Sequence, residues 1–84
     1  MKKIVIKDNF AFIYLNSGFY NEKAILNTIK IYSDFIDASF SELGKYYIVK
    51  IKNKTTEYNL EKLANEFLNY ILSIEFELNS EKLN

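Results

Sequence analysis

Apolar and polar positions alternate over residues 2–16, a pattern typical of a β-hairpin with one buried face. Its two apolar runs, 3–7 and 10–15, are separated by Asp8-Asn9, residue types that tolerate the positive φ of a two-residue turn. With that turn, Lys7 lies opposite Phe10, and the alternation predicts one apolar face and one mixed face. The expected core face carries Ile4, Ile6, Ala11, Ile13 and Leu15. The mixed face carries Lys3, Val5, Lys7, Phe10, Phe12 and Tyr14.

Helical spacing follows the Asn16-Ser17-Gly18 segment. Asn21 is a suitable N-cap, and Glu22 lies in the first turn, where a carboxylate is favourable. The polar positions lie 4, 3, 4 and 3 residues apart, which predicts one solvated stripe on a helix that reaches about residue 37. These positions are Lys23, Asn27, Lys30, Asp34 and Asp37. The apolar side consists of Ala24, Ile25, Ile29, Ile31, Tyr32, Phe35 and Ile36.

A second hairpin and a second helix follow. The hairpin spans about 38–53 and turns at Leu43-Gly44, which places Glu42 opposite Lys45. The same register places Phe40 opposite Tyr47 and Ala38 opposite Val49. Its mixed face carries Ser39, Ser41, Tyr46, Ile48, Lys50 and Lys52. The final helix, capped by Asn59 or Thr56, reaches about residue 77, and residues 79–84 form a frayed tail.

The element order is therefore ββαββα in a single domain, 1–84. We expect an α+β two-layer sandwich, a four-stranded antiparallel sheet with two helices on one face. The other face of the sheet is then uncovered. We call it the open face, and its apolar residues are the candidate binding residues: Val5, Phe10, Phe12, Tyr14, Tyr46 and Ile48.

Composition excludes several classes of function. The chain has no Cys, His or Arg, so disulfides, thiolate metal sites and the commonest general base are absent, and we expect no metal or cofactor. A net charge of zero argues against nucleic-acid binding, and two glycines cannot build a phosphate loop. The apolar run after Met1 ends at Lys7, too soon for a signal peptide, and no stretch approaches a membrane span. We expect a cytoplasmic protein without membrane contact.

The open face is the strongest indication of function. A sheet face with four aromatic residues is usually covered, and a second copy, another protein or a peptide could cover it. The alternative is that lysine stems cover it sufficiently. Lys50, Lys52 and Lys54 form either a basic stripe for an acidic partner or, as we favour, protection of a sheet edge. Asp34 and Asp37, one helical turn apart, are interpreted as solvated surface carboxylates rather than a site.

Three segments resemble the HxsD-like family, the small accessory proteins of His-Xaa-Ser peptide-modification systems. They are Phe19-Tyr20, residues 31–35 and residues 66–72, and the resemblance extends over about 13–74. The family-motif residues are Tyr20, Tyr32, Glu66, Phe67 and Asn69. The resemblance implies a non-catalytic partner of a radical S-adenosylmethionine (SAM) enzyme that binds the ribosomally made precursor peptide, the enzyme, or both. The chain departs from the family at Glu75-Phe76-Glu77, where basic residues often follow the motif.

Two other functions remain open. One is a stand-alone protein inhibitor or regulator, of the kind found in phages or mobile elements, that acts through the open face. It predicts one tight protein target and no link to a precursor peptide. The other is a small enzyme that uses Asp, Glu, Lys or Tyr, which requires a concave polar pocket. We expect no enzyme and assign no catalytic residue.

Overall fold

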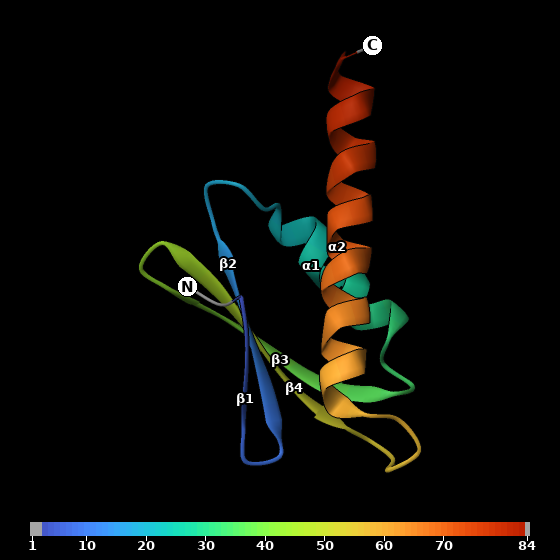
Figure 1. The fold of residues 1–84 in the computed structure, drawn as a ribbon. Helices are drawn as coiled ribbons and strands as arrows, with labels where there is room; N and C mark the ends of the chain where they lie inside the picture. Colours follow the sequence, from blue (N-terminus) through green and yellow to red (C-terminus); the bar gives the residue numbers. More distant parts are fainter. Residues whose placement is uncertain (1–2, 84) are drawn as a thin grey trace.

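The computed structural model describes residues 3–83, and the side chains of residues 3–77. The elements in chain order are β1 (Ile4–Lys7), β2 (Phe10–Asn16), α1 (Glu22–Ile31), β3 (Ile36–Leu43), β4 (Tyr46–Asn53) and α2 (Leu60–Leu83). The strands form one four-stranded antiparallel sheet in the order β1-β2-β4-β3. Both helices lie on the same side of this sheet (Figure 1), so the expected α+β sandwich is confirmed.

The first hairpin has the predicted register. Lys7 pairs with Phe10, Val5 with Phe12 and Ile4 with Ile13. Asp8 has a φ of 56°, the left-handed conformation that a tight two-residue turn requires at its first position. The local sequence therefore fixes which side chains of β1 and β2 share a face.

The second hairpin turns one residue later than predicted. Leu43 pairs with Tyr46, so the turn is Gly44-Lys45, and Phe40 faces Val49 instead of Tyr47. Gly44 has a φ of 59°, which glycine adopts without steric cost at the first position of such a turn. The predicted pairs are thus wrong by two residues. Because side chains alternate with a period of two, this shift leaves the predicted faces unchanged.

Helix α1 is shorter than predicted. It begins after Asn21, whose side-chain oxygen accepts a 2.9 Å hydrogen bond from the Lys23 N–H, as expected of an N-cap. It ends at Ile31, and the Ser33 hydroxyl donates to the Lys30 carbonyl at 2.8 Å. Residue 36 already belongs to β3, where it pairs with Asn53. The helical spacing of polar residues in the sequence extends beyond Ile31. The helix nevertheless ends there, because strand pairing with β4 outweighs the local helical preference.

Helix α2 has the predicted start but extends further. The Asn59 side chain accepts a 3.0 Å hydrogen bond from the Lys62 N–H, so Asn59 is the cap. The helix continues to Leu83 and projects well beyond the sheet (Figure 1). Residues 79–83 have a helical backbone and Asn84 lies outside the described residues, and the fraying of 79–84 stays a prediction. Among the described residues, neither helix combines the length and apolarity that crossing a bilayer requires.

The core lies between the helices and one face of the two central strands. Its fully buried side chains come from β2, β4, α1 and α2 and include Ala11, Ile13, Leu15, Ala24, Ile25, Val49, Ile51, Phe67 and Ile71. The Thr28 hydroxyl is buried too, and it donates to the Ala24 carbonyl at 2.7 Å. Ile6, predicted for the core, is 43% exposed because β1 is an edge strand and Ile6 borders an open hollow.

Two phenylalanines of α2 provide a matched test of this core. Phe67 is completely buried, whereas Phe76 is 73% exposed. We expect Phe67→Ala to lower the free energy of unfolding by about 3–5 kcal/mol, because it leaves a cavity in the core. Phe76→Ala should change it by less than about 1 kcal/mol. Denaturant unfolding measures the free energy of unfolding of both variants. Phe67→Leu removes fewer atoms and replaces Phe67→Ala if the alanine variant does not fold. Equal losses at the two positions would contradict this packing.

Candidate functional site

The open face of the sheet carries the six predicted apolar residues, and the strand pairing brings most of them side by side. Val5 lies opposite Phe12, and Tyr14 lies opposite Ile48. Tyr46 lies at the end of β4, opposite Asn16. No helix of the described residues 3–83 lies on this side of the sheet (Figure 1). The sheet therefore has one buried face and one face turned away from the core.

Lysine side chains cover part of the open face. The Lys50 Nζ lies 4.1 Å from the centre of the Phe10 ring and 6.0 Å from that of Phe12. The Lys52 Nζ lies 5.9 Å from the Phe10 ring. These are cation–π distances, and the lysine stems shield the rings while the ammonium groups stay near water. Phe10 and Phe12 are half-buried, as are Tyr14, Tyr46 and Ile48, and Val5 is 39% exposed.

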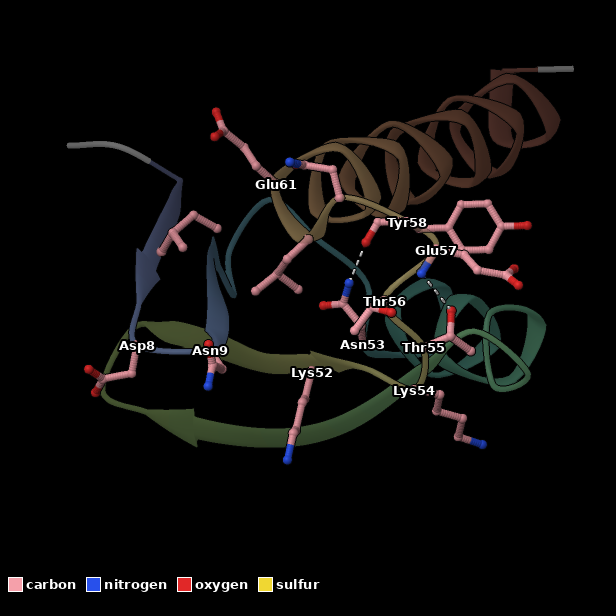
Figure 2. Close-up of a pocket in the computed structure, with 13 residues that line it drawn as sticks. Asp8, Asn9, Lys52, Asn53, Lys54, Thr55, Thr56, Glu57, Tyr58 and Glu61 are labelled. Carbon is pink, nitrogen blue, oxygen red and sulfur yellow. Dashed lines mark hydrogen bonds between the residues drawn. The ribbon is translucent and has the colours of Figure 1, made fainter.

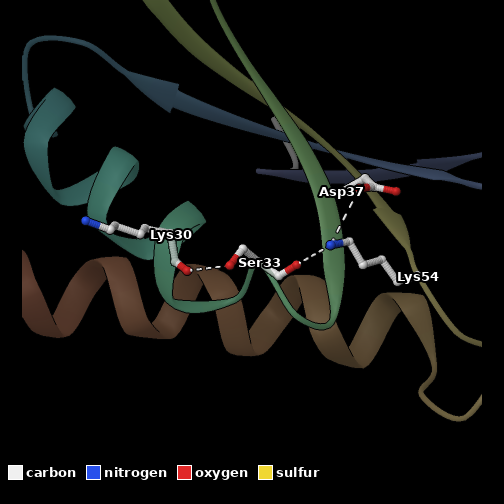
Figure 3. Close-up of polar contacts among 4 residues, drawn as sticks. All are labelled: Lys30, Ser33, Asp37 and Lys54. Atoms are coloured by element: carbon white, nitrogen blue, oxygen red, sulfur yellow. Dashed lines mark hydrogen bonds and ion pairs between the residues drawn. The ribbon is translucent and has the colours of Figure 1, made fainter.

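The edge-protection interpretation of the lysines is wrong. Strand β4 lies between β2 and β3, so Lys50 and Lys52 belong to a central strand. Lys54 lies beyond the end of β4. Its Nζ donates to the Ser33 carbonyl at 2.5 Å and is 4.0 Å from the Asp37 carboxylate (Figure 3). Lys54 thus ties the turn after α1 to β3 and is not a third member of a basic stripe.

The two aspartates are exposed, as interpreted from the sequence, but their predicted placement one helical turn apart is wrong. Asp34 lies in the turn after α1, and Asp37 lies on β3, so they are not neighbours on one helix. Asp37 instead forms the exposed ion pair with Lys54, which contributes little to stability in water. Among the described residues, no group of three or more carboxylates is placed to hold a metal ion.

Leu43 is an apolar residue of the open face that the sequence reasoning missed. It was assigned to the turn, but it is the last residue of β3, pairs with Tyr46 and is 71% exposed. Glycine favours the positive φ that the first residue of such a turn needs. Choosing Gly44 as that first residue would have placed Leu43 in the strand.

A small hollow indents the open face near the end of the sheet where β2 and β3 begin and β4 ends. Its volume is about 210 Å³, and it is lined by Phe10, Asp37, Ala38, Ser39, Lys50 and Lys52. The ammonium groups of Lys50 and Lys52 lie 4.1 Å and 5.9 Å from the centre of the Phe10 ring, and Asp37 lines the same hollow. A carboxylate of a partner would find two positive charges beside an apolar surface here.

A larger hollow among the described residues lies elsewhere, between the turn of the first hairpin and the loop from β4 to α2. It measures about 980 Å³ and is wide open, and the side chains of Asp8, Lys52 and Lys54 point away from one another (Figure 2). The loop is held by its own contacts, with the Asn53 side chain donating to the Tyr58 carbonyl at 2.6 Å. Asp8, Lys52 and Lys54 therefore do not converge on one substrate position as an acid and a base would.

The family-motif residues are divided between the core and the surface. The Tyr32 ring lies 5.7 Å from that of Phe67 and 5.9 Å from that of Tyr70, between α1 and α2. Tyr20 is half-buried, and its hydroxyl accepts a 2.7 Å hydrogen bond from the Lys3 Nζ. Glu66 and Asn69 are exposed on α2. Phe67 and Tyr32 thus pack the helices together.

Tyr32 has a perturbed acidity. Burial raises the pKa of its phenol above the ordinary value of 10.0, and the negative charge of Glu66 and the neighbouring Tyr70 raise it further. The neutral phenol is therefore favoured at this position.

Comparison of the chain with protein-family models, curated proteins and solved structures gives no match. The HxsD-like resemblance accordingly stays a hypothesis.

The raised pKa of Tyr32 predicts a pH dependence of stability. A folded-state pKa above the unfolded value of about 10 stabilises the fold below pH 10, and this contribution is lost as pH rises through the folded-state pKa. Tyr32→Phe keeps the ring and removes the phenol. We expect the wild-type free energy of unfolding to fall more steeply than that of the variant above about pH 10. Urea unfolding at a series of pH values measures the free energy of unfolding of both proteins. If the two free energies fell in parallel with pH, the burial of the phenol would be contradicted.

Proposed function

We propose that this protein is a non-catalytic binding protein that docks its open face on an acidic surface of a protein or peptide partner. The observation that carries the proposal is the one-sided sheet. One face is buried under the helices, and the other presents aromatic and aliphatic side chains beside lysines.

The chemistry of the open face supports a partner that is both apolar and acidic. Removing a fully exposed large side chain from water contributes about 1.5–3 kcal/mol, and covering the half-buried side chains of this face contributes less for each. The ammonium groups of Lys50 and Lys52 flank Phe10, and Asp37 is the carboxylate that shares their hollow. Acidic side chains around an apolar centre would complement this arrangement, and such complementarity favours both association rate and register.

The face is preferred over a strand edge. The outer edge of β3 is eight residues long and could pair with an added peptide strand. Strand addition uses backbone hydrogen bonds and does not require aromatic residues on the open face. A partner docked on the open face would contact the aromatic rings and lysines directly, so their presence favours docking on the face.

The resemblance to HxsD-like proteins supplies a specific partner. On that basis we propose that the protein serves the radical SAM-dependent modification of a ribosomally made peptide. It would bind the precursor peptide, the enzyme, or both, and would have no activity by itself. Two family-motif residues, Tyr32 and Phe67, pack against each other between the helices. Such packing residues are expected to be shared by proteins that share a fold.

A pull-down with matched variants tests the proposal. Phe12→Lys places a charge in the middle of the open face, whereas Phe19→Lys makes the same change at a residue that is 80% exposed in the β2–α1 connection. From native lysate, we expect the wild type and Phe19→Lys to capture a radical SAM enzyme or its precursor peptide. Phe12→Lys should lose it, with affinity for the purified partner reduced about tenfold or more.

Circular dichroism of each variant confirms that it is folded before binding is compared. Recovery of only further copies of this chain would overturn the proposal in favour of a homodimer. A tight target unrelated to peptide modification would support the stand-alone inhibitor instead. Retention of the partner by Phe12→Lys would show that the open face is not the contact.

A further inference from the structure

A cavity on the helical side of the molecule has a different character from the open face. It lies between the turn after α1, the loop before α2 and the first turns of α2, and its volume is about 260 Å³. Its lining residues are Tyr32, Phe35, Tyr58, Asn59, Lys62, Leu63 and Glu66. Three aromatic rings from two segments, the turn after α1 and the loop before α2, thus line one small space.

All three rings line the cavity, and the rings of Phe35 and Tyr58 are not stacked on each other. Phe35 and Tyr58 meet edge to face, with centres 5.7 Å apart and planes at 89°. They are 43% and 46% exposed, although both come from short connections in which polar residues are usual. The negative faces of such rings attract a cation that is placed within about 6 Å of their centres.

The charges at the cavity favour a cation as well. Glu66 lines it and is near enough to Tyr32 to raise the pKa of that phenol. The ion pair within 4.0 Å among the described residues joins Lys54 to Asp37. No described lysine nitrogen therefore lies within that distance of the Glu66 carboxylate. Lys62 also lines the cavity, but among the described residues the ammonium groups that lie over rings are those of Lys3, Lys50 and Lys52. The chain's own lysine therefore does not occupy the aromatic walls.

We propose that this cavity binds the alkylated ammonium head of a lysine side chain presented by a peptide or protein. Three aromatic walls and one carboxylate suit a cation whose charge is spread over methyl groups. A space of about 260 Å³ is smaller than pockets for whole small molecules, which are roughly 300–1,000 Å³, and fits a side-chain head. The site is formed by the α1–β3 and β4–α2 connections, and it does not depend on docking at the open face.

A pair of matched probes tests the role of the charge. The first is Nα-acetyl-trimethyllysine amide, and the second is its carbon analogue, in which an uncharged tert-butyl group replaces the trimethylammonium. Titrated into the full chain, the cation should shift the ring NMR signals of Phe35 and Tyr58. The neutral analogue should bind about tenfold more weakly. Equal affinity would reveal an apolar pocket without cation recognition, and no shift with millimolar cation would exclude the site.

Variants separate the contributions of the lining residues. Tyr58→Ala removes one wall and Glu66→Gln removes the carboxylate, so each should weaken the cation by about threefold to tenfold. Lys62→Gln removes a repelling charge and should strengthen it. Phe76→Ala, in the exposed part of α2, should leave it unchanged. A Lys62→Gln variant that binds the cation less well would overturn the proposal, and so would a Glu66→Gln variant with wild-type affinity.

Discussion

The structure depends on the alternation of side chains along the two central strands. β2 and β4 pair directly, and their inward residues, among them Ile13 and Val49, are fully buried under the helices. The same alternation necessarily turns the intervening residues, such as Phe12 and Ile48, to the other side. Burial of one face therefore determines what the opposite face presents. The open face is a consequence of the register that builds the core.

The open face is a compromise between exposure and protection. Lysine ammonium groups lie over the Phe10 ring, which limits the apolar area in contact with water. The same lysines give the face a positive character, and this charge is the basis for proposing an acidic partner. The cavity near Phe35 and Tyr58 has the opposite preference, because there a carboxylate and π-faces attract a cation. The two surfaces are formed by different segments and would recognise different chemistry.

Local turn chemistry and periodicity were sufficient to predict the element order, the first hairpin and the cap of α1, and they narrowed the cap of α2 to Asn59 or Thr56. Asp8 and Asn21 have the roles expected from their residue types. The errors arose where tertiary contacts decide. Residue 36 continued a helical stripe in the sequence, but pairing with Asn53 draws it into β3. The local pattern also does not specify strand order. It therefore could not show that β4 is a central strand and that Lys50 does not protect a sheet edge. The aromatic cavity joins segments far apart in the chain.

The central claim is that the open face is exposed to solvent in the isolated chain. A soluble paramagnetic agent, which broadens the NMR signals of accessible methyl groups, tests it with pairs of one residue type. Val5 on the open face compares with buried Val49, and Leu43 with buried Leu15. We expect Val5 and Leu43 to broaden strongly and their partners to remain sharp at every protein concentration. Protection of Val5 and Leu43 equal to that of the core would contradict the account, because something would then cover the face.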